Sequence, residues 1–199
     1  MPKRIRREPI YIAPNIMGSI QDDGSYLVID ERENTRLDPT DVFDKIIIYE
    51  RQTKGWFLEP TLRMVRYKPQ NKGFLVLMSC LSYVEATQQY IEGEESNNRS
   101  KQTFVRGVHR LYPDQFSNQE IESLYNQGRC GIFHEGMTRG QIIINSDFED
   151  SITFTAQDIK INPKKFLKDL IDDFNKFIIV LKNNEEARNK FDRLFSNIN

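Results

Sequence analysis

The sequence is poor in the residues from which metal sites and disulfide frameworks are built. Its 199 residues include two cysteines, Cys80 and Cys130, and two histidines. Neither cysteine belongs to a CxxC pair, so we expect no structural zinc site and no cofactor. We interpret both cysteines as free thiols in a reducing compartment.

Long hydrophobic runs and a strong charge imbalance are missing as well. No apolar run approaches the ~20 residues of a membrane span, and the N-terminus lacks the apolar segment of a signal peptide. We therefore expect a cytoplasmic protein without membrane contact. The net charge of −1 gives no global sign of a polyanion partner. A basic arm at residues 3–7 is either a solvated tail or a phosphate-contacting arm.

Several motifs of common enzyme classes are also absent. The chain has no GxxxxGK[ST] loop, no GxGxxG after a strand, no HExxH and no GxSxG. These absences argue against P-loop nucleotide hydrolysis, dinucleotide-dependent chemistry, zinc proteolysis and serine hydrolysis of the usual kinds. Any chemistry must therefore come from a less familiar arrangement of residues.

What the sequence does contain is bulky apolar material with a helical period. Its 13 Phe and 8 Tyr supply residues for a core, and apolar spacing predicts helices at 38–58, 60–65, 74–91, 104–112, 117–136, 163–181 and 184–197. A strand is expected at 25–30, and segments 142–144 and 152–154 are expected to form a β-hairpin. The predicted fold class is mainly α, a helical bundle with a small β-hairpin on its rim. Residues 1–36 form an N-terminal extension and residues 37–199 the helical domain.

The helix predicted at 117–136 has unusual features. Ser117 and Glu120 fit a capping box at its start, and Gly136 is expected to end it. Gly128 and Gly131 fall inside the helix, where each glycine costs up to ~1 kcal/mol relative to alanine. That cost predicts the close approach of another backbone or of a ligand.

The same helix carries Arg129 and, five residues later, His134, followed by Gly136. This pattern resembles the Arg-x4–6-His signature of HEPN domains. An earlier apolar helix with Glu85, a short helix ending at LYPDQF and a long C-terminal helix strengthen the resemblance, which covers about residues 40–183. The resemblance implies a helical bundle that forms a homodimer, with both motifs at one cleft. Many family members are metal-independent ribonucleases, often toxins or phage-defence effectors, and others only bind nucleotide or RNA.

The residue types suit RNA cleavage by attack of the 2′-hydroxyl. Histidine exchanges protons near neutral pH, so His134 would be the general base or acid. Arg129 would hold the phosphate through parallel hydrogen bonds. Glu85 either orients Arg129 or faces solvent.

Other basic residues suggest a second RNA-contacting surface. His109 and Arg110 are either an ordinary surface pair or, with Lys101, Arg106 and Arg139, part of such a surface.

Geometry and one substitution stand against this picture. On an ideal α-helix, five residues at ~100° each leave Arg129 and His134 about 140° apart. Convergence then requires unwinding near Gly136 or a second chain. Cys130 follows the arginine where the family often has Asn, Asp or His, and a thiol orients an arginine poorly. Gly136 stands where some family toxins carry a tyrosine modified by an antitoxin, so that control is not expected.

Two hypotheses follow. The first is a HEPN-type, metal-independent endoribonuclease, a toxin or phage-defence effector that acts as a homodimer and has an antitoxin or other defence-locus protein as a partner. The alternative is a non-catalytic HEPN-like module for RNA or nucleotide binding or for dimerisation. Cys130 and the weak overall basicity favour this alternative.

Overall fold

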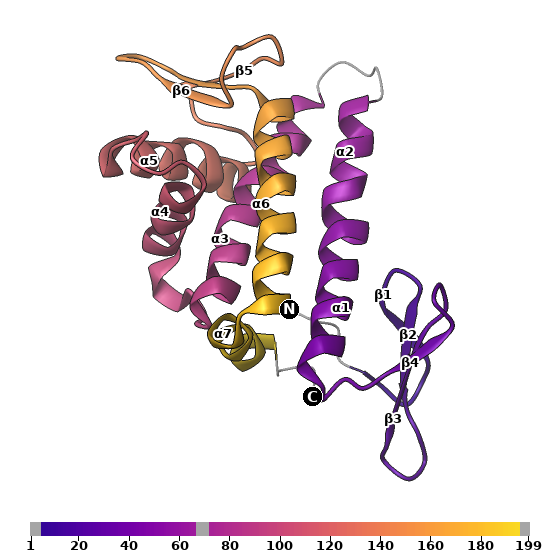
Figure 1. The fold of residues 1–199 in the computed structure, drawn as a ribbon. Helices are drawn as coiled ribbons and strands as arrows, with labels where there is room; N and C mark the ends of the chain where they lie inside the picture. Colours follow the sequence, from indigo (N-terminus) through magenta and orange to yellow (C-terminus); the bar gives the residue numbers. More distant parts are fainter. Residues whose placement is uncertain (1–4, 67–71, 196–199) are drawn as a thin grey trace. The chain divides into compact units, whose positions relative to one another are not determined.

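The computed structural model describes residues 5–66 and 72–195 (Figure 1). The protein is mainly helical, at 59%, with a four-strand antiparallel sheet and a three-strand mixed sheet. Part of the expected basic arm and the end of the last predicted helix lie outside the described residues. The chain divides into two compact units, one from residues up to 60, 90–94 and from 176 on, the other from 61–89 and 95–175.

The first unit contains an antiparallel meander in the strand order β1-β2-β3-β4. Its strands are β1 (Ile10–Ala13), β2 (Ile16–Ile20), β3 (Tyr26–Asp30) and β4 (Thr35–Leu37). The strand expected at 25–30 is confirmed as β3, and Gly24 before it adopts a left-handed φ of 84°. The buried end of β3 is fixed by an ion pair between Asp30 and Arg51, with Oδ2 and Nη2 2.8 Å apart.

A helical segment follows the meander, but it starts later than Asp38. Helix α1 (Val42–Gln52) begins after Asp41, whose carboxylate accepts hydrogen bonds from two backbone N–H groups of the first turn. A π-helical segment, η1 (Thr53–Leu58), leads into α2 (Glu59–Arg66). The expected break at Pro60 is therefore a widened turn immediately before the proline.

Aromatic rings form the core of the first unit around Tyr49. Its ring contacts those of Tyr90, Phe191 and Phe195, with centroids 4.6, 5.2 and 5.9 Å away. The two phenylalanines belong to α7 (Glu185–Phe195). Rings packed at these distances bury a large apolar area, so they attach α7 to α1.

Helix α3 (Gly73–Glu92) is central to the second unit, to which its residues 73–89 belong. Its other helical elements are η2 (Asn97–Arg99), α4 (Ser100–Leu111), α5 (Asn118–Leu124), η3 (Tyr125–Glu135) and the first part of α6 (Pro163–Asn183). Tyr83 of α3 donates a hydrogen bond to Asp173 of α6 at 2.9 Å, which joins these two helices. The predicted helices at 74–91, 104–112 and 163–181 are confirmed, and the predicted capping box of Ser117 and Glu120 is present.

The predicted hairpin of 142–144 with 152–154 is wrong. Strands β5 (Ile142–Ile144) and β6 (Ile152–Phe154) do not pair with each other, because β7 (Ile159–Ile161) lies between them. β6 pairs antiparallel with β7, and β5 pairs parallel with it. A tight turn between Thr155 and Asp158 makes the hairpin, with a backbone hydrogen bond of 2.9 Å.

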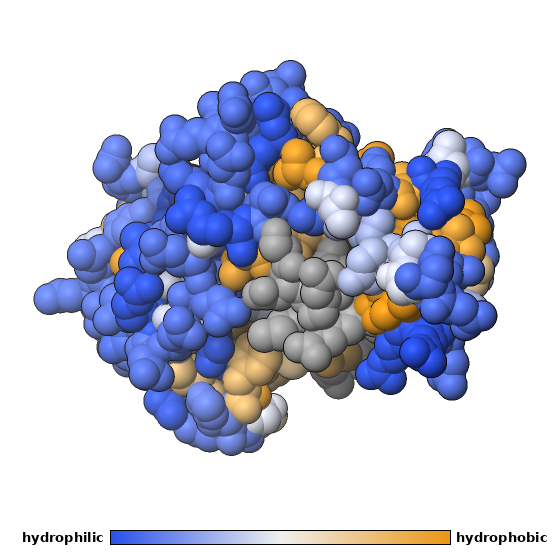
Figure 2. All heavy atoms as spheres, turned by 90° about the horizontal axis from the view of Figure 1, so that it is seen from below, coloured by the Kyte–Doolittle hydropathy of each residue, from blue (hydrophilic) through white to orange (hydrophobic). Residues whose placement is uncertain are grey.

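Exposed hydrophobic side chains are dispersed on the face drawn in Figure 2, which is mostly hydrophilic with small separate apolar patches. The mean hydropathy of the chain is −0.60, in keeping with this surface. Within residues 5–66 and 72–195, no helix is long and apolar enough to cross a membrane.

Candidate functional site

The segment with Arg129 and His134 is a π-helix rather than an α-helix. η3 (Tyr125–Glu135) continues directly from α5 and ends at Gly136, which adopts the left-handed conformation with φ 74°. In a π-helix the backbone hydrogen bonds join residues i and i+5. Such segments are rare in proteins, and those that occur are often found at functional sites. Side chains five residues apart therefore lie about one turn apart. Arg129 and His134 thus come to the same side of the helix, because the wider π-helical turn is itself a loosened helix, and the loosening extends from Tyr125 to Glu135 rather than only near Gly136.

Both glycines of η3 are positions of close approach; another backbone approaches Gly131, as the sequence predicted, whereas the neighbours of Gly128 are side chains. A Cβ added at Gly131 would lie 2.7 Å from the carbonyl oxygen of Met137 and 3.1 Å from the backbone nitrogen of Arg139. A Cβ at Gly128 would lie 3.0 Å from Ile142 and 3.1 Å from Leu81. The neighbours are protein atoms, so these glycines serve packing against the following loop, β5 and α3.

The loop that follows η3 folds back along it. The backbone N–H of Arg139 donates to the carbonyl oxygen of Gln127 at 2.9 Å. The Arg139 side chain bonds Glu135, with N–O distances of 2.9 and 2.6 Å, and this contact is the main cause that lowers the pKa of Glu135. Arg139 thus contacts η3 at Gln127 through its backbone and at Glu135 through its side chain, and these two contacts hold the end of the helix on which His134 lies.

Arg129 is held by a carboxylate and two aromatic rings. Its Nη2 donates to Oε2 of Glu85 at 3.1 Å, and Ser96 donates to the other carboxylate oxygen at 3.0 Å. The guanidinium carbon lies 5.5 Å from the ring centroid of Tyr125 and 5.1 Å from that of Phe133. The interpretation of Glu85 as solvent-facing is wrong, because its side chain is 11% exposed and contacts Arg129. Glu85 orients Arg129, as the other interpretation held.

This arrangement leaves part of the guanidinium available. Among the described residues, Glu85 is the only acceptor of a hydrogen bond from Arg129, and the arginine side chain is 23% exposed. An arginine has five N–H donors in a rigid fork. Arg129 can therefore hold Glu85 through Nη2 and offer Nε and Nη1 to an anion.

Two further side chains lie beside the arginine, and sequence reasoning assigned Tyr125 no role in the site. Burial raises the pKa of the Tyr125 hydroxyl, while the charge of Arg129 opposes that shift and Cys130 and Glu85 add to it. The hydroxyl thus stays protonated at neutral pH. Tyr125 and Phe133 stand four residues before and after Arg129, a spacing that was visible in the sequence.

His134 is exposed, in contrast to Arg129. No described residue forms a hydrogen bond with its imidazole, which is therefore open to a ligand or a partner chain. The neighbouring Phe133 and Met137 are 46% and 62% exposed. Exposed large apolar side chains beside a histidine are suited to contact with another molecule.

The proposed second RNA-contacting residues have partners within the protein. Arg110 forms an ion pair with Asp173, and its Nε donates to Gln88 at 2.9 Å, so it is a part-buried structural residue and not half of a surface pair. His109 Nε2 lies 2.6 Å from the Asn118 side-chain oxygen. Arg110 is thus engaged within the protein and cannot readily contact RNA.

The remaining members of the proposed surface have local contacts too. Arg106 is exposed and lies 3.4 Å from the hydroxyl of Thr103 on the same helix, and Lys101 lies 3.7 Å from Glu122. Arg139 lies against η3, because its backbone N–H donates a hydrogen bond to the carbonyl oxygen of Gln127. Of these cations, Arg139 therefore has the most direct structural link to the Arg129 site.

Metal ligands do not gather at this site. In the described part of the chain, no group of three or more His, Cys, Asp or Glu side chains is placed to hold a metal ion. No protein-family model, curated protein or solved structure matches this chain.

The packing of Gly131 makes a prediction about stability. Gly131→Ala places a methyl group against the backbone at Met137, which cannot move as a side chain can. We expect the free energy of unfolding to fall by about 1–2 kcal/mol, measured by urea denaturation. Gly140→Ala is the control, because a Cβ there meets no atom within 4 Å. Equal effects of the two substitutions would contradict this account.

Proposed function

We propose that this protein is a HEPN-type endoribonuclease that acts as a homodimer without a metal ion. One observation carries the proposal: η3 is π-helical, so Arg129 and His134 share a side, and Glu85 holds the arginine in place. The helical-bundle arrangement of the family, a cytoplasmic location and a toxin or phage-defence role with a defence-locus partner are parts of the same proposal.

Each residue has a chemical task in this reaction. Arg129 binds the scissile phosphate through Nε and Nη1 and stabilises the negative charge that develops there. His134 removes the proton of the 2′-hydroxyl, or donates one to the departing 5′-oxygen. The 2′-oxygen forms a bond to phosphorus as the 5′-oxygen leaves. The products carry a 2′,3′-cyclic phosphate and a 5′-hydroxyl.

A second copy of the chain completes the proposal. The reaction needs a base and an acid together, and one imidazole cannot hold both protonation states. A homodimer supplies two histidines and two arginines at one cleft. The exposed side chains of Phe133 and Met137 beside His134 support an interface here, and Arg139 could add an RNA contact.

A non-catalytic RNA-binding module is the alternative, and one observation favours it. The Glu85 carboxylate already neutralises Arg129, and Cys130 supplies no strong hydrogen bond to orient the free part of the guanidinium. Such a site would bind RNA with less stabilisation of the developing charge. Binding would then occur without cleavage.

The proposal is tested by incubating end-labelled RNA with the full chain in excess EDTA. We expect cleavage into products with 2′,3′-cyclic phosphate ends and no cleavage of a substrate with 2′-deoxyribose throughout. RNA binding that weakens steeply with salt, without products, would select the alternative. A strict need for a divalent metal would contradict the mechanism.

A further inference from the structure

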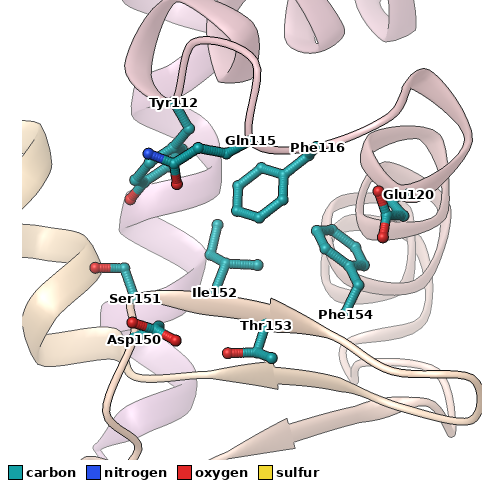
Figure 3. A pocket seen from close by; sticks show the side chains of 9 residues that line it. All are labelled: Tyr112, Gln115, Phe116, Glu120, Asp150, Ser151, Ile152, Thr153 and Phe154. Carbon is teal, nitrogen blue, oxygen red and sulfur yellow. The ribbon is translucent and has the colours of Figure 1, made fainter.

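A separate cavity of about 540 Å³ lies in the second unit, away from the contacts of Arg129 and His134. It is formed by the loop between α4 and α5, the start of α5, and β6 with the residues before it (Figure 3). The lining includes Tyr112, Phe116, Glu120, Asp150, Ile152 and Phe154. This volume is typical of a small-molecule site.

The middle of the cavity is apolar and aromatic. The rings of Phe116 and Phe154 meet edge to face with centroids 5.1 Å apart, and the ring of Tyr112 lies 5.5 Å from that of Phe116. Ile152 lies below the rings of Tyr112 and Phe116 in Figure 3. The Tyr112 hydroxyl donates to Asp169 at 2.7 Å, so its polar end is already occupied. The middle of the cavity therefore offers hydrocarbon and ring surface to a ligand.

The two ends of the cavity are acidic. Glu120 and Asp150 lie on opposite sides of the phenyl rings (Figure 3). Oε2 of Glu120 accepts hydrogen bonds from the backbone N–H and hydroxyl of Ser117, both at 2.8 Å, which leaves Oε1 free. The carboxylate of Asp150 is exposed and has no hydrogen-bond partner among the described residues. No Lys, Arg or His belongs to the lining.

This distribution of charge selects against anionic ligands. A nucleotide or an RNA strand would bring phosphates toward two carboxylates with no cation to offset them. A cation is favoured at each end instead, and aromatic faces attract cations as well. Because an apolar stretch separates the acidic ends, the complementary ligand has two positive groups joined by methylenes.

We propose that this cavity binds a linear aliphatic polyammonium compound. One ammonium group pairs with Asp150 and another with Oε1 of Glu120, while the methylene chain lies against Phe116 and Phe154. The proposal is independent of RNA cleavage, because the two sites share no residue. Binding at this cavity can thus succeed or fail separately from the ribonuclease mechanism.

The test is calorimetric titration of the full chain with spermidine at low ionic strength. We expect saturable binding, with 1,4-diaminobutane weaker, butylamine weaker still and 1,4-butanediol inactive. Asp150→Asn and Glu120→Gln should each weaken spermidine binding roughly tenfold. Glutamine preserves the capping box at Glu120, so α5 should stay intact. Asp147→Asn, an exposed carboxylate of the same loop outside the cavity, is the matched control and should change affinity less than about twofold.

Several results would overturn the proposal. Absence of saturable spermidine binding would do so, as would an equal loss in Asp147→Asn, which would indicate non-specific attraction of polycations. Tighter binding of an RNA oligonucleotide or of a lysine-bearing peptide at the same residues would assign the cavity to another ligand. His134→Ala should leave spermidine affinity unchanged, which keeps this test separate from that of the catalytic site.

Discussion

His134→Ala is expected to lower the rate of RNA cleavage by a factor of about 10²–10⁴, the usual contribution of general acid–base catalysis. The free energy of unfolding should stay within about 0.5 kcal/mol of the unsubstituted protein, since surface substitutions without contacts have small effects. The reason is structural: the imidazole is exposed and makes no hydrogen bond within the described chain. Cleavage rates and urea denaturation measure the two quantities separately.

The protein provides its own control for this experiment, because it has two histidines. His109 lies on α4 and bonds Asn118 at 2.6 Å. His109→Ala also removes one imidazole ring, but that ring does not belong to the proposed catalytic site, so cleavage should continue at a similar rate. Cleavage that survives His134→Ala, or that is lost equally in His109→Ala, would disprove the assignment of His134.

Arg129→Ala is expected to reduce both activity and stability. Loss of a preorganised donor to the developing charge should lower the cleavage rate by a factor of about 10²–10³. It also leaves Glu85 largely buried without its cation. We expect the free energy of unfolding to fall by about 2–3 kcal/mol, less than the ~3–5 kcal/mol of a fully buried ion pair, because Arg129 is partly exposed.

A double substitution separates the two losses. Glu85→Gln in the Arg129→Ala background removes the unpaired negative charge, so most of the lost stability should return while the cleavage rate stays as low as in Arg129→Ala. Arg129→Lys should retain stability, because an ammonium can still pair with Glu85. It should lower cleavage, because a lysine that pairs with Glu85 has no rigid fork left for a phosphate. Full cleavage in Arg129→Lys would show that the fork has no catalytic role.

Local rules of the sequence predicted the ends of helices well. The side chains of Ser117 and Glu120 satisfy backbone groups within three residues, so tertiary packing could not easily displace that helix start. Gly136 ends η3 in the left-handed conformation, as expected of a glycine at that place. At α1 the same rules predicted the wrong N-cap residue. Asp41 caps the helix, and Asp38 accepts a hydrogen bond within the turn that precedes it.

Contacts between residues far apart in the sequence were harder to predict from the sequence. Segment 159–161 is only three residues long, and nothing local shows that it separates β5 from β6. Parallel pairing of β5 with β7 requires the hairpin of β6 and β7 to fold back so that β7, rather than β6, lies beside β5. The contact between Glu85 and Arg129 spans 44 residues. The sequence could name both residues as candidates, but not decide whether Glu85 met Arg129 or water.

The sequence by itself determined the predominance of helix, most helix ends and the two residues of the candidate motif, because caps, glycines and apolar periods act within a few residues. Only the tertiary structure decided that the segment from Tyr125 to Glu135 is π-helical. Its wider turn goes together with contacts outside the helix, since Gly131 lies against the loop that follows and Gly128 lies against Leu81 of α3 and Ile142 of β5. The wider turn places Arg129 and His134, which an α-helix would separate, on one side of the helix.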